Sequence, residues 1–200
     1  NVIAGKIKSS ACYLNDLTNY AKGNLERVIN SDNAFERQLE KMGLSKKMPD
    51  DEQEVRDMVR ARAKATTNLA LHLSMVGRLG IIIDGTGDDY RKINKTKILL
   101  NHLGYDTYMI FVNTSLDVAL ERNQARERTV PEYVTIKSWQ DVQRNIGAFQ
   151  NTFTAQNFII VDNNISAKEL VTMTMNKVSK FVRQLMSAPI KNYEAKKWIA

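Results

Sequence analysis

The sequence is poor in the residues that build disulfide frameworks and zinc sites. Its 200 residues include one cysteine, Cys12, and two histidines. A single cysteine excludes an internal disulfide framework and is typical of a reducing compartment, so we expect a cytoplasmic protein. One cysteine and two histidines are also too few for a zinc site made of His and Cys ligands.

Long apolar runs, repeats and flexible linkers are missing as well. No run is long enough to cross a bilayer, so we expect no membrane partner. Only three prolines and nine glycines interrupt the chain, and no low-complexity segment divides it. A chain of 200 residues fits one domain with one sizeable core. The sequence therefore predicts a domain over residues 1–187, followed by a basic tail over 188–200.

Positive charge is in excess along the chain. Lysine and arginine number 29 against 22 aspartates and glutamates, which gives a net charge of +7. This excess predicts anionic partners such as nucleotides, phosphorylated metabolites or nucleic acid. No base-reading motif is evident, and aromatic residues do not alternate with the basic runs. Nucleic-acid binding as a sole function therefore ranks lowest among the hypotheses.

Short apolar runs alternate with longer helical segments. Strands are predicted in "NVIAG" (1–5), "RVINSD" (27–32), "LGIIIDGTG" (79–87), "YDTYMIFVNT" (105–114) and "NFIIVDNN" (157–164). Helices are predicted over 9–20, 33–43, 50–77, 91–104, 115–128, 139–153 and 166–186. Pro131 is expected to end the helix that carries residues 115–128, because the residue before a proline disfavours the α region. This alternation predicts an α/β fold with a parallel sheet of five strands, covered by helices on both faces.

Polar residues follow directly after the predicted strands. These segments are "AGKIKSS" (4–10), "NSDNAFER" (30–37), "DGTGDD" (84–89), "NTSLD" (113–117) and "DNN" (162–164). In open parallel sheets, ligands bind outside the carboxyl ends of the strands. Each segment alone is also explained by turns and helix caps. Their joint occurrence predicts a binding site at one edge of the sheet, where Asp32 and Asp84 should both lie.

Three arginines lie close together in "ALERNQARERTVPE" (119–132). Arg122 and Arg126 stand four residues apart, so on a helix they would share one face and repel by roughly a few tenths of a kcal/mol. Neither has an acid three or four residues away in the sequence. Planar guanidinium groups bind phosphate oxygens in pairs. A phosphate-binding site and a solvated basic helix face are therefore both open for this cluster, which includes Arg128.

Four segments occur in an order and spacing that resemble a known family. They are "VINSDNAFERQLE", "IIIDGTG", "VNTSLDVALERNQARERTVPE" and "FIIVDNN". The chain resembles the P-loop kinases of the zeta-toxin type, relatives of small-molecule and polynucleotide kinases that phages often carry. The resemblance covers roughly residues 1–165. It implies a three-layer P-loop NTPase fold with an arginine-rich lid.

The activity that the resemblance implies is a phosphotransferase. Such a kinase would use Mg²⁺ and move the γ-phosphate of ATP or GTP to a hydroxyl of a small molecule or of a nucleic-acid end. The alternative is a catalytically inactive nucleotide-binding protein with a regulatory or structural role. The acceptor, the choice between ATP and GTP, and the oligomeric state are left open by the sequence.

The resemblance also implies roles for individual residues. The arginine-rich segment corresponds to the lid, over about 122–137, in which Arg122, Arg126 and Arg128 close over the transferred phosphoryl group. Asp32 would be the general base that acts on the acceptor hydroxyl, with a plain helix N-cap as the alternative. Asp84 would help to hold Mg²⁺ or orient the substrate, with a turn as the alternative.

Two further residues belong to the candidate site. Arg37, on the helix after Asp32, is a candidate substrate contact, and a solvated role is equally open. Asn163, after the last predicted strand, is a candidate nucleotide contact.

The phosphate-binding loop departs from the family pattern. That pattern is G-x-x-x-x-G-K-[ST], whereas the chain has "VIAGKIKSSACYL", in which the loop is too short. Either the chain has lost the loop, or the sequence joins the residues that flank it. In the second case Gly5, Lys6, Lys8 and Ser9 are the nucleotide-binding residues, with either lysine reaching the phosphates and Ser9 also a metal ligand.

Overall fold

The computed structural model describes residues 2–4, 26–47, 49–164 and 168–199. The predicted helix over 9–20 and the predicted phosphate-loop residues Gly5, Lys6, Lys8 and Ser9 lie outside these ranges. The elements are β1 (Val2–Ala4), β2 (Glu26–Ile29), α2 (Ser31–Lys41), η1 (Asp50–Glu52), α3 (Gln53–Val76), β3 (Gly80–Ile83), α4 (Tyr90–His102), β4 (Thr107–Asn113), α5 (Leu116–Gln124), α6 (Glu132–Phe153), β5 (Phe158–Asp162), α7 (Lys168–Ser187) and α8 (Tyr193–Ile199).

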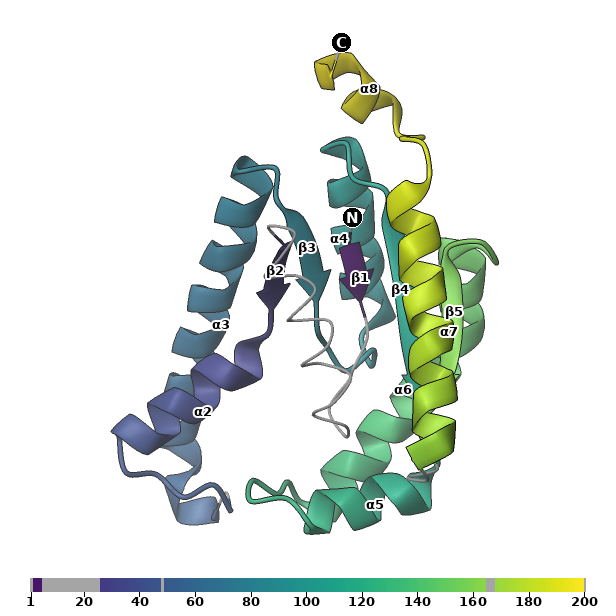
Figure 1. Ribbon diagram of the computed structural model, residues 1–200. Coiled ribbons are helices and arrows are strands. Elements are labelled where there is room, and N and C mark those ends of the chain that lie inside the picture. The colour runs from purple at the N-terminus through teal and green to yellow at the C-terminus, as the bar shows by residue number, and fades with distance from the viewer. Residues whose placement is uncertain (1, 5–25, 48, 165–167, 200) are drawn as a thin grey trace.

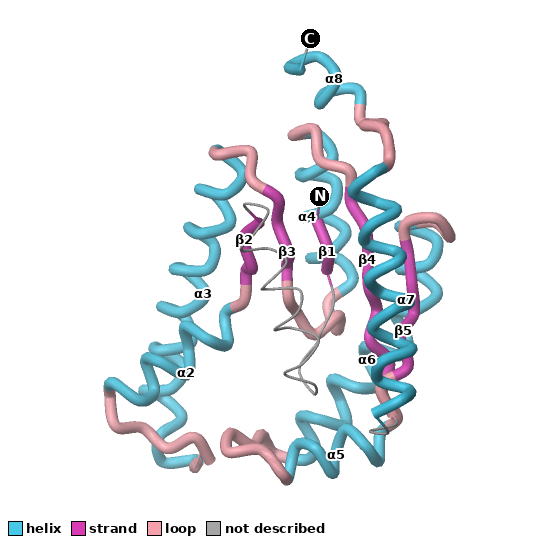
Figure 2. The backbone as a smooth tube through the Cα atoms, viewed as in Figure 1, coloured by secondary structure: helices cyan, strands magenta, loops and turns pink. Residues whose placement is uncertain are grey.

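The strands form one sheet in the order β2-β3-β1-β4-β5, and every neighbouring pair is parallel. Ile3 of the central strand β1 pairs with Ile82 of β3 on one side and with Tyr108 of β4 on the other. Figure 2 shows the strands at the centre of the molecule, with helices around them. The predicted α/β class is thus confirmed, and β1 is the central strand of the sheet.

Helices cover both faces of the sheet, because alternate side chains of a strand point to opposite faces. Ile82 and Ile110 pack against α7, which crosses the front of the sheet in Figure 1. Met109 and Phe111 pack on the opposite face, against Phe149 of α6. Helices α3 and α4 contribute to the hydrophobic clusters on this second face. Among the described residues, no helix combines the length and the apolar character that a membrane span requires.

The carboxyl ends of the strands lie at the lower end of the molecule in Figure 1, where α2 and α5 begin. The loops that follow these helices, over 42–47 and 125–131, face each other there (Figure 2). A hydrogen bond of 2.9 Å from Lys46 Nζ to Glu127 Oε1 joins the two loops. The fold therefore brings three segments together at one edge: the start of α2, the loop after it, and the arginine-rich segment.

The arginine-rich segment differs from its prediction. Helix α5 ends at Gln124 rather than just before Pro131. The side chain of Asn123 bonds both the backbone N–H and the carbonyl of Val130, and this turns the chain back on itself. Pro131 precedes α6, which begins at Glu132, earlier than the predicted start at 139. The irregular part of the predicted lid is therefore 125–131, and both of its flanks are helical.

Candidate active site

A cleft of about 440 Å³ opens at the carboxyl edge of the sheet. Its walls come from α2, α3, α5, α6, the loop after β3, the ends of β4 and β5, and the loop 125–131. Four of the lining residues are arginines, whereas two are acids: Arg60, Arg122, Arg126, Arg128, Asp32 and Asp88. An excess of cations in a recessed site concentrates anions such as phosphates.

Asn30 caps α2. Its Oδ1 accepts a 2.7 Å hydrogen bond from the backbone N–H of Asp32, and its backbone is extended, as is usual for an N-cap. The alternative that Asp32 is the N-cap is therefore wrong, because Asn30 holds the cap position and Asp32 lies within the helix. Asp32 lies in the first turn of α2 and lines the cleft, near the positive end of the helix dipole.

Asp84 lies beside the start of α2. The side-chain Nδ2 of Asn30 donates a 2.5 Å hydrogen bond to Asp84 Oδ2, and the backbone N–H of Asp84 bonds the carbonyl of Ile29. One asparagine thus contacts both the amide of Asp32 and the carboxylate of Asp84. The two acids lie at the same edge of the sheet, as the parallel arrangement predicts.

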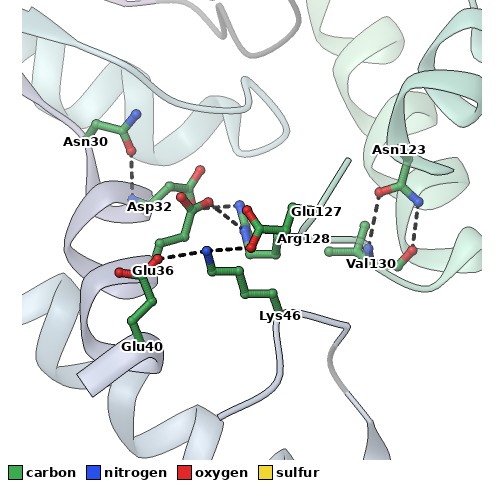
Figure 3. Close-up of polar contacts among 9 residues, drawn as sticks. All are labelled: Asn30, Asp32, Glu36, Glu40, Lys46, Asn123, Glu127, Arg128 and Val130. Atoms are coloured by element: carbon green, nitrogen blue, oxygen red, sulfur yellow. Dashed lines mark hydrogen bonds and ion pairs between the residues drawn. The ribbon is translucent and has the colours of Figure 1, made fainter. Parts of the chain in front are cut away.

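Arg128 lies against α2, as Figure 3 shows. Its Nε donates a 2.8 Å hydrogen bond to Glu36 Oε1, and its Nη2 lies 3.6 Å from Asp32 Oδ1. Its side chain is only 14% exposed. Glu36 precedes Arg128 by 92 residues in the sequence, and Asp32 lies one helical turn before Glu36. A search for acids three or four residues away could not have found them.

Arg122 and Arg126 do not share one helix, contrary to the prediction. Arg122 lies on α5 and donates a 2.7 Å hydrogen bond from Nη1 to the carbonyl of Asn163, whereas Arg126 follows the end of α5. Burial, followed by the charges of Arg128 and Arg122, lowers the pKa of the Arg126 guanidinium. Asp32 and Glu36 act on this pKa in the opposite direction, so Arg126 lies near acids as well as near other cations.

Arg60 is a cation of the cleft that sequence reasoning missed. Its Cζ lies 4.3 Å from the ring centroid of Phe35, and its pKa is lowered by burial first and by Arg128 next. Arg56, one turn earlier on α3, donates instead to the carbonyl of Pro49 and to the side chain of Gln53. The two arginines lie one turn apart on α3, and Arg60 lines the cleft whereas Arg56 does not.

Helix α6 contributes a face that sequence reasoning also missed. Thr135, Trp139 and Gln143, spaced by four, all line the cleft, and this spacing was a usable signal. Trp139 Nε1 donates to the carbonyl of Thr114 and Gln143 Nε2 to Asn113 Oδ1, both at 2.8 Å. The buried hydroxyl of Thr135 has no hydrogen-bond partner within the described part of the chain.

The other predicted site residues lie in different surroundings. Asn163 is buried and lines the cleft, and its backbone N–H bonds the carbonyl of Asn113. Arg37 is exposed, its Nε bonds the carbonyl of Asn33 in its own helix, and it is not among the residues that line the cleft. No group of three or more His, Cys, Asp or Glu side chains suited to a metal occurs among the residues that the structure describes.

Solved structures with a similar fold include a gluconokinase, a shikimate kinase and a structure of a toxin–antitoxin system. A gluconokinase from Sinorhizobium meliloti 1021 is 13% identical, with 92% of this chain and 94% of that chain covered. A structure of the PezAT chromosomal toxin–antitoxin system of Streptococcus pneumoniae is 14% identical, with 94% and 87% covered. Shikimate kinase from Bacteroides thetaiotaomicron is 10% identical, with 91% and 97% covered. The TM-score is 0.52 in all three cases, and identities this low show a shared fold alone.

Sequence comparison supplies the family. No curated protein shows significant similarity to the chain. The profile of the zeta toxin family matches residues 42–173, which is more than half of the chain. The matched range includes α3, the arginine-rich segment and β5, and it therefore carries most of the residues that line the cleft. The chain belongs to the zeta toxin family.

Proposed function

We propose that the chain is a phosphotransferase that moves the γ-phosphate of ATP or GTP to a hydroxyl of a small molecule or of a nucleic-acid end. The observation that carries this proposal is the convergence of Arg122, Arg126 and Arg128 with Asp32 in one cleft at the carboxyl edge of a parallel sheet. Phosphoryl transfer asks little covalent chemistry of a protein and depends on positioning and on positive charge around the transferred group.

In the proposed reaction, the aspartate and the arginines of the cleft have different roles. Asp32 accepts the proton of the acceptor hydroxyl as the acceptor oxygen forms its bond to the γ-phosphorus. The bond between that phosphorus and the bridging β,γ-oxygen breaks, and the nucleoside diphosphate leaves. Arg122, Arg126 and Arg128 form the proposed lid and neutralise the charge that spreads over the phosphoryl oxygens. Family membership and the kinase-like fold support this assignment.

Mg²⁺ fits the residues at the end of β3. Magnesium commonly binds through one or two carboxylates together with phosphate oxygens and water, so a cluster of three protein ligands is not required. Asp84 is the carboxylate that would hold it, beside the carboxamide of Asn30. When bound, the ion would neutralise charge on the nucleotide phosphates. Ser9, the other proposed metal ligand, and the proposed phosphate-binding residues Gly5, Lys6 and Lys8 lie outside the described residues.

The test is direct transfer of label. The purified chain is incubated with Mg²⁺, γ-labelled ATP or GTP, and nucleoside diphosphate sugars, nucleosides or 5′-hydroxyl oligonucleotides. Label should move to one class of acceptor, and α-labelled nucleotide should transfer none. Arg126→Ala should lower kcat more than nucleotide affinity, because the arginine acts chiefly on transition-state charge. Nucleotide binding without transfer to any acceptor would overturn the proposal.

A further inference from the structure

An acidic stripe runs along one face of α2. Asp32, Glu36 and Glu40 are spaced by four residues, so their side chains lie above one another on the helix. The first two contact Arg128, at 3.6 Å and 2.8 Å. Glu40 lies 2.8 Å from Lys46 Nζ. The stripe is thus matched along its length by cations from two other segments, as Figure 3 shows.

Glu127 and Arg128 are consecutive residues that dock the loop 125–131 onto this stripe. Glu127 does so through Lys46, which bonds Glu127 as well as Glu40. The pKa of Lys46 is raised by its hydrogen bonds with Glu40 first and Glu127 next. Arg128, the next residue after Glu127, bonds Glu36. Glu127 and Arg128 carry opposite charges, and each contacts a side chain of the opposite sign. A shift of the loop by one residue would therefore place an arginine opposite Lys46.

The two contacts differ in strength. Glu127 is 77% exposed, and exposed ion pairs stabilise a contact only weakly. Arg128 is largely buried, and its Nε forms a charge-assisted hydrogen bond of 2.8 Å to Glu36. Glu36 therefore fixes the guanidinium, and Lys46 adds a weaker restraint on the loop that carries it.

We propose that Glu36 is a positioning residue for phosphoryl transfer: it holds the guanidinium of Arg128 at the rim of the cleft, with its Nη atoms toward Asp32 and the reacting groups. This inference rests on the proposed phosphotransferase function. During transfer the Nε contact to Glu36 is kept, while the Nη contact passes from Asp32 to the transferred phosphoryl group. Without Glu36, Arg128 would pair with Asp32 alone, and both its orientation and the access of Asp32 to the acceptor proton would suffer.

The kinetic test is Glu36→Gln, with Glu40→Gln as the matched control on the same helix. Glu36→Gln should lower kcat by roughly ten- to a hundredfold and change the KM for ATP less than about threefold, because misplaced catalytic groups cost turnover rather than ground-state binding. Glu40→Gln should stay within about twofold of the unmodified chain, since Glu40 does not contact Arg128. Both side chains are at least partly exposed, so melting should change little in either variant.

The structural test is hydrogen exchange over 125–131, which needs no turnover. Glu36→Gln should speed exchange of this loop more than Glu127→Lys does, and for Glu127→Lys we expect about two- to fivefold. Lys46→Glu combined with Glu127→Lys should restore slow exchange. This swap is made in the Glu40→Gln background, because Glu40 would otherwise repel the new glutamate at position 46.

The outcomes separate this inference from the proposed function. If the unmodified chain transfers no phosphate, the proposed function fails, and exchange alone still decides whether the loop docks on α2. Unchanged exchange in Glu36→Gln overturns the docking. Faster exchange with unchanged kcat overturns the positioning role of Glu36. A fall in kcat shared equally by Glu40→Gln also overturns it, because the effect would then follow the charge of the helix rather than the contact with Arg128.

Discussion

At the scale of single residues, the structure separates two roles that the sequence left together at Asp32. Asn30 is the N-cap of α2, so Asp32 lies in the first turn of the helix rather than at its cap position. Asp117 occupies the same position in the first turn of α5, but it is exposed and does not line the cleft. The two aspartates therefore share a local environment and differ in their access to the candidate site.

Asp32→Asn should abolish most phosphoryl transfer while leaving the fold intact. Asparagine cannot accept the acceptor proton, so kcat should fall by at least about a hundredfold. Loss of a charge near the helix N-terminus should cost only about 0.3–1 kcal/mol of stability. Turnover and thermal melting are measured beside Asp117→Asn, which should match the unmodified chain in activity. Wild-type turnover in Asp32→Asn would mean that another group is the base.

Thr135→Val should stabilise the chain. The buried Thr135 hydroxyl has no hydrogen-bond partner in the described structure, and an unsatisfied buried polar group costs about 1–3 kcal/mol. Valine keeps the shape and removes the hydroxyl, so the midpoint of chemical denaturation should rise. Thr135→Ser, which keeps the hydroxyl and loses the methyl group, should not show this gain. A lower midpoint for valine would indicate that the hydroxyl has a partner in solution.

At the scale of elements, the connection between α5 and α6 determines where the arginines lie. Asn123 is only 8% exposed and closes the loop through bonds of 2.8 Å and 3.2 Å to Val130. Since α5 stops at Gln124, Arg126 and Arg128 leave the helix and lie in the loop. In a helix that continued to Pro131, Arg122 and Arg126 would instead have lain on the same helix face.

Asn123→Ala should destabilise this connection. It removes both bonds to Val130, and each buried group left unpaired costs about 1–3 kcal/mol. We expect melting to fall by about 2–4 °C per kcal/mol lost, together with lower turnover. Asn123→Asp keeps the acceptor for the Val130 amide but cannot donate to its carbonyl, so it should fall between alanine and the unmodified chain. Equal melting for all three chains would show that the loop is held by other contacts.

At the scale of the whole molecule, the net charge of +7 and the parallel sheet act on the same site. Parallel strands bring their carboxyl ends to one edge, and the arginines of four separate positions meet there. Because arginines outnumber acids at this site, we expect an anionic ligand to stabilise the folded chain.

ATP should therefore raise the melting temperature. A ligand at 100 times its Kd stabilises the folded state by about 2.7 kcal/mol, which is about 5–10 °C for a chain of this size. Adenosine at the same concentration should produce a smaller shift, because it lacks the phosphates. Salt well above about 0.15 M should reduce the ATP shift by screening the exposed cations. Equal shifts with ATP and adenosine would place the binding energy in the base rather than in the arginine cluster.

Much of the fold could be predicted from local patterns. Non-alternating apolar runs identified the buried strands β3 and β4, and the polar residues after each strand identified the edge where the cleft opens. The arginine cluster was found from the close spacing of its members and from the lack of acids three or four residues from Arg122 and Arg126. The partners of Arg128 and the role of Arg60 were not predicted, because both depend on α2 and α3 packing against distant segments.

The sequence by itself determined the alternation of strands and helices, the polar strand ends and the presence of closely spaced cations, since each is a property of residues near one another in the chain. Only the tertiary structure decided that Asn30 contacts Asp84, that Arg122 bonds the carbonyl of Asn163, and that Arg128 meets Glu36 across 92 residues. The physical reason is that hydrophobic periodicity is local, whereas ion pairs and side-chain hydrogen bonds form between whichever polar groups the packed elements bring together.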